Sequence, residues 1–388
     1  MNVYMDYGAA SPVDLLVLEA MMPYFSESFG NPSSFHSHAY LAQNALKTAR
    51  MRVSSLIGAR PEEVVFTSGA TESNNLALIG AASRYRSRGG RIVVSTIEHI
   101  STLNICKELQ KQDFEIKYVP VDDEGVISLQ KLDEFVDNDT VIVSVMAANG
   151  EIGTIQPIEE ASKIAHEHDA LFHTDATAAA GKIPLNVFEA DVDLITLSSN
   201  DIYGPKGVGA LYVKKGLRVR PLIIGGGQED GMRSGSENIP GIVGMGKAAE
   251  LAEAEMADEA ERQTKMRDSL IEGITKTVPE SFLNGHPTRR LPNNANIRFR
   301  YVEGEALILS LDQLGIQVSS GSACTAKTLE PSHVLLAIGL KHEEAHGSLV
   351  FTLGKGNREE HVDYVINQLP GVLRNLRSIS PLTPKELR

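Results

Sequence analysis

Residues 63–75 indicate the fold class and read Glu63-Val64-Val65-Phe66-Thr67-Ser68-Gly69-Ala70-Thr71-Glu72-Ser73-Asn74-Asn75. The first five residues are rich in β-branched and aromatic side chains and predict a short buried strand. Small and polar residues follow, and residues 75–83 have the apolar spacing of a helix. A strand that leads into a helix through a few small residues is typical of a βα unit.

Further along the chain, similar apolar runs predict more buried strands at residues 91–95, 140–145, 170–174 and 193–198. Residues 158–167 have helical spacing between two of these runs. Alternating strands and helices imply an α/β fold with a mostly parallel sheet covered on both faces. Residues 207–213 follow a strand too closely for a crossover, so they predict an antiparallel neighbour. In sheets of this kind, ligands bind at the carboxyl ends of the strands.

A change in composition predicts two domains. Near Leu251 a charged helix begins that we expect to end near Val278, and an α+β region follows from Leu291. We place the domain boundary near residue 256. Residues 13–256 would form a large α/β domain, and residues 1–12 and 257–388 a smaller α+β domain.

The overall composition narrows the class of protein. The 388 residues carry a formal net charge of −13, so we expect no binding to nucleic acid or to anionic membranes. No apolar run is long enough to span a bilayer, and residues 1–6 do not resemble a signal peptide. The two cysteines, Cys106 and Cys324, suit a reducing compartment, and we expect the cytoplasm. Cys106 has apolar neighbours at helical spacing, which favours a buried position.

Four polar residues fall near the predicted carboxyl ends of strands. Thr71 stands near the start of a helix, where backbone N–H groups can bind an anion; the alternative is a capped helix after a tight turn. His99, Asp175 and Ser198 follow or end three other strands. Taken singly, each is more often a satisfied polar residue in a loop. Together, at one edge of one sheet, they predict a ligand site.

Ten short motifs run through the chain in one order: Asp6-Tyr7, 29–34, 66–75, Glu98-His99, 151–153, 174–177, 202–207, 231–236, 319–324 and 330–332. In this order they resemble the NifS/IscS-type cysteine desulfurases, which belong to the class V aminotransferase group of fold-type I enzymes dependent on pyridoxal 5'-phosphate. The resemblance covers nearly the whole chain. It implies a seven-stranded, mostly parallel sheet in the large domain, a smaller α+β domain and a homodimer.

The resemblance also implies a set of cofactor-binding residues. They are Ala70, Thr71, His99, Asp175, Ser198, Asn200 and Ser236. Thr71, Ser198 and Ser236 would bind the phosphate, with Ser236 supplied by the second subunit. Asp175 would pair with the pyridinium nitrogen and make the ring an electron sink, and His99 would stack on the ring.

Cys324 matches the family cysteine that attacks the substrate sulfur and holds it as a persulfide. It lies in the Gly/Ser-rich stretch of residues 319–324, and a loop suits a group that must reach an acceptor protein. The thiolate is the reactive form of such a cysteine. The resemblance therefore implies L-cysteine as substrate and an IscU-type iron–sulfur scaffold as partner.

One position breaks the family pattern. The family reads Ser-Gly-His-Lys before Ile-Tyr-Gly-Pro-Lys-Gly, whereas this chain has Ser198-Ser199-Asn200-Asp201. The family lysine binds the cofactor covalently and shuttles a proton, and aspartate can form no imine. Two like charges about 5 Å apart repel by roughly 3 kcal/mol at an effective dielectric near 20. Asp201 therefore opposes an anionic cofactor unless it takes up a proton.

Three further departures surround the same site. Gly150 and Ala178 replace an asparagine and a glutamine that bind the ring hydroxyl in the family, and Val350 replaces the arginine that binds the substrate carboxylate. Lys206 exists in the family in addition to the catalytic lysine, so we do not expect it to take over. These losses predict that pyridoxal 5'-phosphate binds weakly or not at all and that desulfuration is impaired or absent.

Several functions remain open. In the first, Cys324 carries a persulfide, from cysteine or a persulfide donor, or ligates a 2Fe–2S cluster shared with the scaffold. In the second, the chain is an active desulfurase that binds its cofactor without a covalent link. A different lyase is disfavoured by the missing arginine. A zinc hydrolase could use His342, Glu343 and His346, but Gly347 ends that helix and no third ligand is near.

Overall fold

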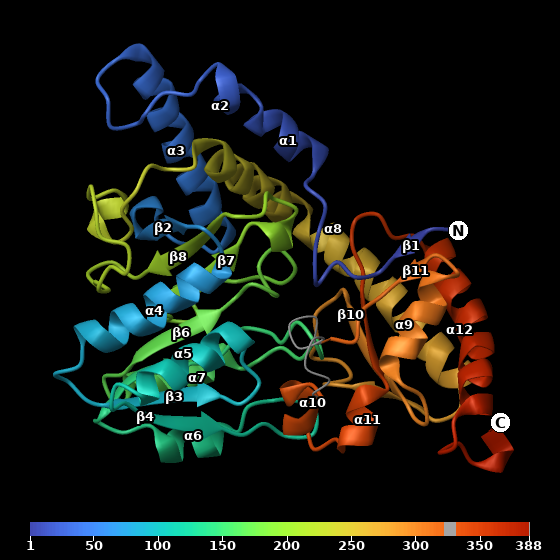
Figure 1. Ribbon diagram of the computed structural model, residues 1–388. Coiled ribbons are helices and arrows are strands. Elements are labelled where there is room, and N and C mark those ends of the chain that lie inside the picture. The colour runs from blue at the N-terminus through green and yellow to red at the C-terminus, as the bar shows by residue number, and fades with distance from the viewer. Residues whose placement is uncertain (322–330, 388) are drawn as a thin grey trace.

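The computed structural model describes residues 1–321 and 331–387. Its largest sheet has seven strands in the order β2-β8-β7-β6-β5-β3-β4 (Figure 1). The strands are β2 (Val64–Thr67), β3 (Arg91–Ser95), β4 (Glu115–Val119), β5 (Thr140–Ser144), β6 (Leu171–Asp175), β7 (Leu194–Ser198) and β8 (Gly209–Val213). Only β8 runs antiparallel to its neighbours, β2 and β7. The predicted mostly parallel, seven-stranded sheet and the antiparallel placing of residues 207–213 are both confirmed.

Helices cover both faces of this sheet, as the α/β pattern predicts. One face packs on α4 (Ala70–Arg84) and α5 (Ile100–Gln110). The other packs on α3 (Ser37–Leu56), α6 (Leu129–Phe135), α7 (Ile158–His166) and the first part of α8 (Ile239–Thr277). The central residues of β3 are all apolar because their side chains are buried on both faces of the sheet. Ile92 and Val94 belong to the first core and Val93 to the second, so successive side chains are buried on opposite faces.

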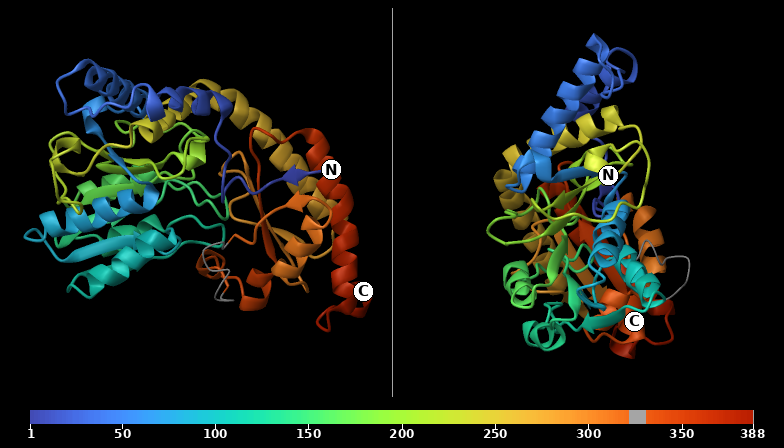
Figure 2. Two further views of the ribbon diagram at one scale, coloured as in Figure 1. Left: turned by 45° about the horizontal axis from the view of Figure 1, so that its top comes forward. Right: turned by 90° about the vertical axis from the view of Figure 1, so that its left-hand side faces the viewer.

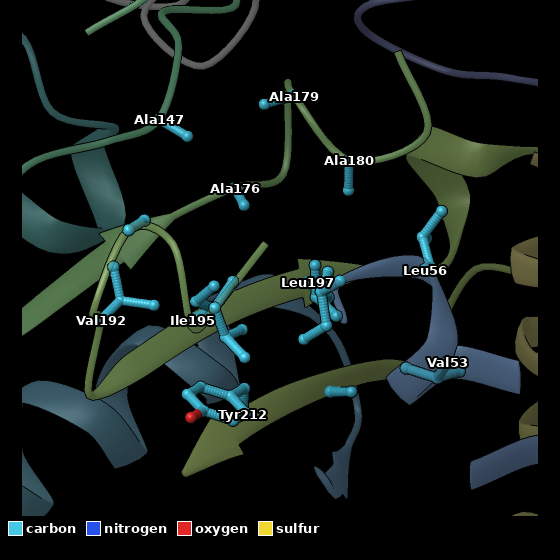
Figure 3. Packing of buried hydrophobic residues seen from close by; sticks show 14 of the residues in the cluster. Val53, Leu56, Ala147, Ala176, Ala179, Ala180, Val192, Ile195, Leu197 and Tyr212 are labelled. Atoms are coloured by element: carbon cyan, nitrogen blue, oxygen red, sulfur yellow. The ribbon is translucent and has the colours of Figure 1, made fainter. Parts of the chain in front are cut away.

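The second of these cores is dense with side chains from the sheet and α3. Figure 3 shows Val53 and Leu56 of α3 beside the sheet residues Ile195, Leu197 and Tyr212. Leu197 and Tyr212 are at most 2% exposed. This packing holds β7 and β8 in place, and β7 carries Ser198 at its end.

Helix α8 begins earlier than predicted. The charged composition suggested a start near Leu251, whereas the helix begins at Ile239. Glycines in its first turns lower the helix propensity of that stretch. They are required by close packing: a Cβ on Gly246 would lie 2.5 Å from Cα of Ala49, and one on Gly244 would lie 2.6 Å from Sδ of Met21. The tertiary contact with α3 and α1 (Leu15–Met21) therefore decides where the helix starts.

The C-terminal part of the chain builds a second, smaller core. A three-stranded antiparallel sheet has the order β12-β10-β9, with β9 (Ser281–Asn284), β10 (Asn294–Phe299) and β12 (Ser348–Thr352). A separate parallel pair joins β1 (Val3–Tyr4) to β11 (Ile316–Gln317), which brings the N-terminus here. Leu270 of α8, Ile297 and Leu369 pack together, with α9 (Gly304–Asp312) and α12 (Glu359–Ile379) around them. Helix α8 is continuous through residue 256, and the boundary proposed there stays a prediction.

The remaining elements are short. They are α2 (Pro23–Ser26), α10 (His333–Ala337), α11 (His342–His346) and the 3₁₀ turns η1 (Pro61–Glu63), η2 (Asn200–Ile202), η3 (Glu229–Gly231) and η4 (Lys385–Leu387). Helices α1 to α3 extend beyond the main sheet, as both views of Figure 2 show. Among the described residues, no helix is both long and apolar enough to cross a bilayer.

Candidate active site

A cavity of about 550 Å³ opens at the carboxyl ends of the central strands, between the main sheet and the smaller core. It lies where the sequence predicts a ligand site. Asp201 and Val350 line it. So do six of the seven proposed cofactor residues, namely Ala70, Thr71, His99, Asp175, Ser198 and Asn200. Ser236 does not line the cavity and is exposed in this single chain. Cys324 lies outside the described residues.

The start of α4 faces the cavity without a side-chain cap. Gly69 precedes the helix with a φ of 149°, a conformation that favours glycine, and no side chain of the described residues caps the first-turn N–H groups. Such free N–H groups, with the hydroxyl of Thr71, suit a phosphate. Glu72 in the same turn is held by Arg233, whose Nε lies 3.0 Å from its Oε1, and by the backbone N–H of Ser68 at 2.8 Å.

Asp175 ends β6 and is fixed by two donors. The side-chain amide of Asn74 donates to its Oδ2 at 2.8 Å, and the backbone N–H of Thr177 donates to its Oδ1 at 3.0 Å. Behind it, His173 is fully buried between the hydroxyls of Ser144 and Thr196. Burial lowers the pKa of His173 to about 4, so the imidazole is neutral near pH 7. The Asp175 carboxylate therefore faces the cavity without a cation from that side.

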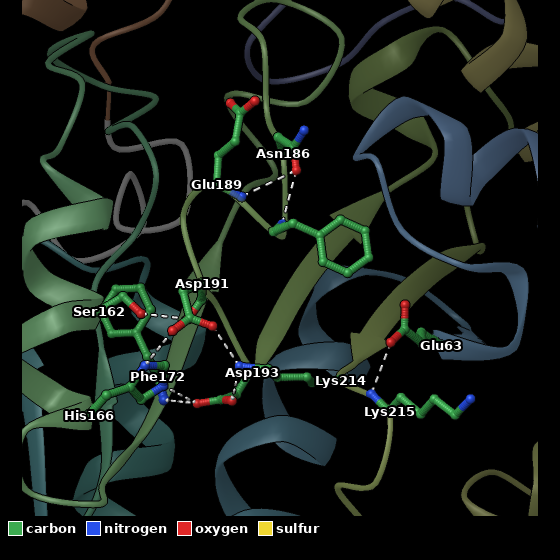
Figure 4. A network of polar contacts seen from close by, with 11 residues as sticks. Glu63, Ser162, His166, Phe172, Asn186, Glu189, Asp191, Asp193, Lys214 and Lys215 are labelled. Atoms are coloured by element: carbon green, nitrogen blue, oxygen red, sulfur yellow. Dashed lines mark hydrogen bonds and ion pairs between the residues drawn. The ribbon is translucent and has the colours of Figure 1, made fainter.

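The network in Figure 4 holds the opposite ends of the same two strands. Oδ2 of Asp193, just before β7, accepts the backbone N–H of Phe172 in β6 at 2.8 Å and contacts Nε2 of His166 at 2.8 Å. The hydrogen bond to Asp193 raises the pKa of His166 above its ordinary value. Lys214, which directly follows β8, joins the network through a salt bridge of 2.7 Å between its Nζ and Oδ1 of Asp191. These contacts fix the register of the strands that end in Asp175 and Ser198.

Glu98 and His99 lie at the start of α5, on the next part of the wall. His99 is the N-cap, and its Nδ1 accepts the backbone N–H of Ser101 at 3.2 Å. Glu98 is completely buried, and its Oε1 accepts the backbone N–H of Met146 at 2.8 Å. Its Oε2 has no hydrogen-bond partner among the described residues. Burial raises the pKa of Glu98 well above its ordinary value, with repulsion from Asp175 adding to the effect.

Asp201 lies on η2 and faces the same cavity. Burial raises the pKa of its carboxyl group, and the charge of Lys182 opposes that change. Nζ of Lys182 donates to the backbone carbonyl of Asp201 at 3.3 Å, not to the carboxylate. Lys206 is exposed, and its Nζ is 3.4 Å from the carbonyl of Ser11. No lysine or arginine lines the cavity within residues 1–321 and 331–387.

Small and apolar side chains form another part of the wall. A Cβ on Gly150 would meet only the methyl group of Ala178, at 3.4 Å, so both positions leave room in the cavity. Val350 of β12 is 3% exposed and pairs with Asn296 of β10. None of these three lining residues offers a charged or amide side chain to a ligand.

Glu151 belongs to the motif of residues 151–153, but the sequence did not predict a role for its side chain. Its Oε2 accepts the hydroxyl of Ser332 at 2.8 Å. A Cβ on Gly321 would lie 2.7 Å from Cγ of Glu151, so that glycine packs closely on the same side chain. Gly321 and Ser332 are placed on either side of residues 322–330. Burial raises the pKa of Glu151 to about 7. Only the folded chain brings these three residues together.

Two other features of the sequence have structural explanations. The segment His342-Glu343-Glu344-Ala345-His346 forms α11 and ends at Gly347 as expected. Glu344 binds Arg300 at 2.8 Å, and no group of three metal-ligating residues occurs among the described residues. Cys106 is confirmed as a buried residue of α5, and burial raises the pKa of its thiol to about 12.

Comparison with known proteins decides the family. The class-V aminotransferase model matches residues 3–365. Cysteine desulfurase IscS 1 of Archaeoglobus fulgidus is 56% identical over 379 residues, which cover 98% of this chain and 99% of that protein. The chain is a member of the cysteine desulfurase family. Another member, cysteine desulfurase IscS of Methanosarcina thermophila, is 49% identical over 100% of this chain and 95% of its own length. A solved NifS-like protein superposes with a TM-score of 0.91 at 39% identity, covering 97% of this chain and 100% of its own.

Cysteine desulfurases use pyridoxal 5'-phosphate, and the cavity fits that cofactor in part. The free N–H groups of α4, with Thr71 and Ser198, suit the phosphate, and Asp175 suits the ring nitrogen. Buried oxygens of Thr177 and Asn200 lack partners among the described residues, as expected of a wall that contacts a ligand. The described lining contains no amine for a covalent link. The residues therefore fit a cofactor held by non-covalent contacts.

Proposed function

We propose that this protein acts in sulfur transfer and iron–sulfur cluster assembly through Cys324, with pyridoxal-dependent desulfuration of L-cysteine impaired or absent. One observation carries the proposal: Asp201 and Val350 line a cavity whose described wall has no lysine or arginine. In the family motifs, a lysine and an arginine correspond to these two positions. Without them, the cofactor lacks its covalent link and a substrate carboxylate lacks its cation.

The cofactor site itself is retained in this proposal. When bound, pyridoxal 5'-phosphate supplies an electron sink in its ring. Thr71, Ser198 and the N-terminus of α4 would bind the phosphate, with Ser236 contributed by a second subunit. Asp175 would hold the ring nitrogen, supported by Asn74 at 2.8 Å. His99 would cover one face of the ring, and Ala70 and Asn200 would complete the contacts.

A homodimer is supported by apolar side chains that the single chain leaves exposed. They lie on the segment from α1 to α3, which extends beyond the main sheet in Figure 2. The side chain of Phe35 is fully exposed. Exposed apolar groups of this size mark association surfaces. Members of the group are Leu15, Phe25, Phe29, Phe35 and Tyr40. The expected partners are a second copy, an IscU-type scaffold, and cysteine or a persulfide donor, in the cytoplasm.

The role of Cys324 is tested by cluster assembly on an IscU-type scaffold. The purified protein is mixed with scaffold and iron, and with either a sulfide source, which tests Cys324 as a cluster ligand, or a persulfide donor and a thiol reductant, which test it as a persulfide carrier. Cluster formation is followed by visible absorbance and circular dichroism. We expect Cys324→Ala to reduce the cluster yield or to change its spectrum. Cys106→Ala is the matched control, because Cys106 is buried in α5 and far from solvent. Equal yields and spectra with wild-type protein and Cys324→Ala would contradict the proposal.

A second function, an active desulfurase with non-covalently bound cofactor, is favoured by the uncapped end of α4 and by Asp175. Its test is sulfide release from L-cysteine with added pyridoxal 5'-phosphate, compared with the free cofactor alone. Release well above the free-cofactor rate, lost in Asp175→Ala, would support it. Release equal to that rate would exclude it and leave the assembly role.

A further inference from the structure

The lining of the cavity is acidic. Six of its described residues carry carboxyl groups, Asp6, Glu72, Glu98, Glu151, Asp175 and Asp201, and none is a lysine or arginine. Of these six, only Glu72 forms a salt bridge with a residue that the structure describes, Arg233 at 3.0 Å. Burial raises the pKa of Glu98, Glu151 and Asp201, and each of these groups that is ionised favours a ligand that presents a positive group. The N-terminus of α4 is the part of the wall suited to an anion.

Two acidic side chains in the wall have no direct ion pair with a described residue. Oε2 of Glu98 is fully buried without a partner among the described residues, and burial raises the pKa of this group well above its ordinary value. Asp201 forms no salt bridge with a described residue. Burial has the larger effect on the pKa of Asp201 and raises it, whereas the charge of Lys182 and side-chain hydrogen bonds with Ser198 and Asn200 lower it. Nζ of Lys182 itself donates to the backbone carbonyl at 3.3 Å and not to the carboxylate. A partly buried carboxylate without an ion pair is costly, and a bound cation would relieve that cost.

We propose that the cavity selects the amine form of its vitamer, pyridoxamine 5'-phosphate, with Asp201 accepting the ammonium group of the ligand. Three charged parts of this ligand find matching groups in one wall. The phosphate suits the N-terminus of α4, the ring nitrogen suits Asp175, and the ammonium suits Asp201. In the family pattern the amine at this site belongs to a protein lysine, and here it belongs to the ligand. The inference rests on the proposed cofactor site and is independent of the role of Cys324.

Direct binding measurements test the inference without relying on activity. The full-length protein, freed of bound vitamers, is titrated with pyridoxamine 5'-phosphate and with pyridoxine 5'-phosphate, which has a hydroxyl in place of the amine. A charge-assisted hydrogen bond should make the amine bind at least about tenfold more tightly. Pyridoxamine without phosphate should bind much more weakly than its phosphate ester, because it loses the contacts at α4.

The contribution of Asp201 is isolated by Asp201→Asn, which keeps the size and removes the charge. In this variant we expect the affinity ratio of the two phosphates to fall to about one, while pyridoxine 5'-phosphate itself binds at least as tightly as before. Asp123→Asn is the matched control, because Asp123 is exposed and outside the cavity lining. It should leave the ratio unchanged.

Three results would overturn the inference. They are equal affinity of the wild-type protein for both phosphates, a ratio that survives Asp201→Asn, or co-purification with the free aldehyde form. If Asp201→Asn fails to fold, as judged by circular dichroism, the wild-type comparison and the identity of the extracted vitamer still decide. Cluster assembly through Cys324 is measured separately, so the proposed function can stand while this inference fails.

Discussion

Glu151→Gln tests the electrostatics of the cavity wall. Glu151 is partly buried, its Oε2 accepts the hydroxyl of Ser332 at 2.8 Å, and its Oε1 has no hydrogen-bond partner among the described residues. Burial raises its pKa from 4.5 to about 7. Since one pKa unit corresponds to ~1.36 kcal/mol, the charged form is disfavoured in the folded protein by about 3 kcal/mol. Glutamine has the same shape and cannot ionise.

The sign of the pH dependence follows from the raised pKa. Below pH 4.5, Glu151 is protonated in both the folded and unfolded chain and contributes no difference. As the pH rises from 4.5 to about 7, the unfolded chain releases the proton first, so the folded state loses stability. Above pH 7 the loss is complete. Glu151→Gln should therefore match the wild type near pH 4.5 and exceed its stability at pH 8.

Thermal unfolding at a series of pH values measures this difference. With an unfolding entropy of about 2.1 cal/mol/K per residue, 3 kcal/mol corresponds to a Tm increase of about 4 °C at pH 8 in a chain of this length. Glu189→Gln is the control, since Glu189 is exposed and its carboxylate has no contact in the network of Figure 4. A Tm difference for Glu151→Gln that is the same at pH 5 and pH 8 would refute the reasoning.

Three further outcomes are expected. Asp201→Lys should form a covalent adduct with pyridoxal 5'-phosphate, detected at that position by mass spectrometry after borohydride reduction; absence of the adduct would contradict an intact cofactor site. In Cys324→Ala, the remaining thiol of Cys106 should resist thiol reagents in the native protein and react only on unfolding, because it is buried with a pKa of about 12. His166→Gln should lose more stability at pH 6 than at pH 9. The raised pKa of His166 stabilises the fold below its unfolded pKa of 6.5, and this contribution disappears as the pH rises through the folded value. Urea midpoints that shift equally at both pH values would contradict that assignment.

The sequence by itself determined the main sheet and the edge at which the cavity opens. Strands β3, β5, β6 and β7 are buried on both faces, so each contains a short apolar run that can be recognised in the sequence. The short connection before β8 excluded a crossover and therefore predicted its antiparallel direction. Asp175 and Ser198 could be placed because each ends a predicted strand. Strand β4 escaped prediction because its alternate residues are charged or exposed at the sheet edge.

The groups that surround Asp201 and Glu151 could not be predicted from the sequence. Ser332 is 181 residues from Glu151, and Lys182 is 19 residues from Asp201, so neither contact leaves a periodic signal in the sequence. The start of α8 was hidden for the same reason, since its glycines pack closely on residues from distant segments, Gly246 on Ala49 and Gly244 on Met21. Spacing along the chain records burial and secondary structure. The charge balance of a cavity depends on residues brought together from distant segments, and it appears only when the chain has folded.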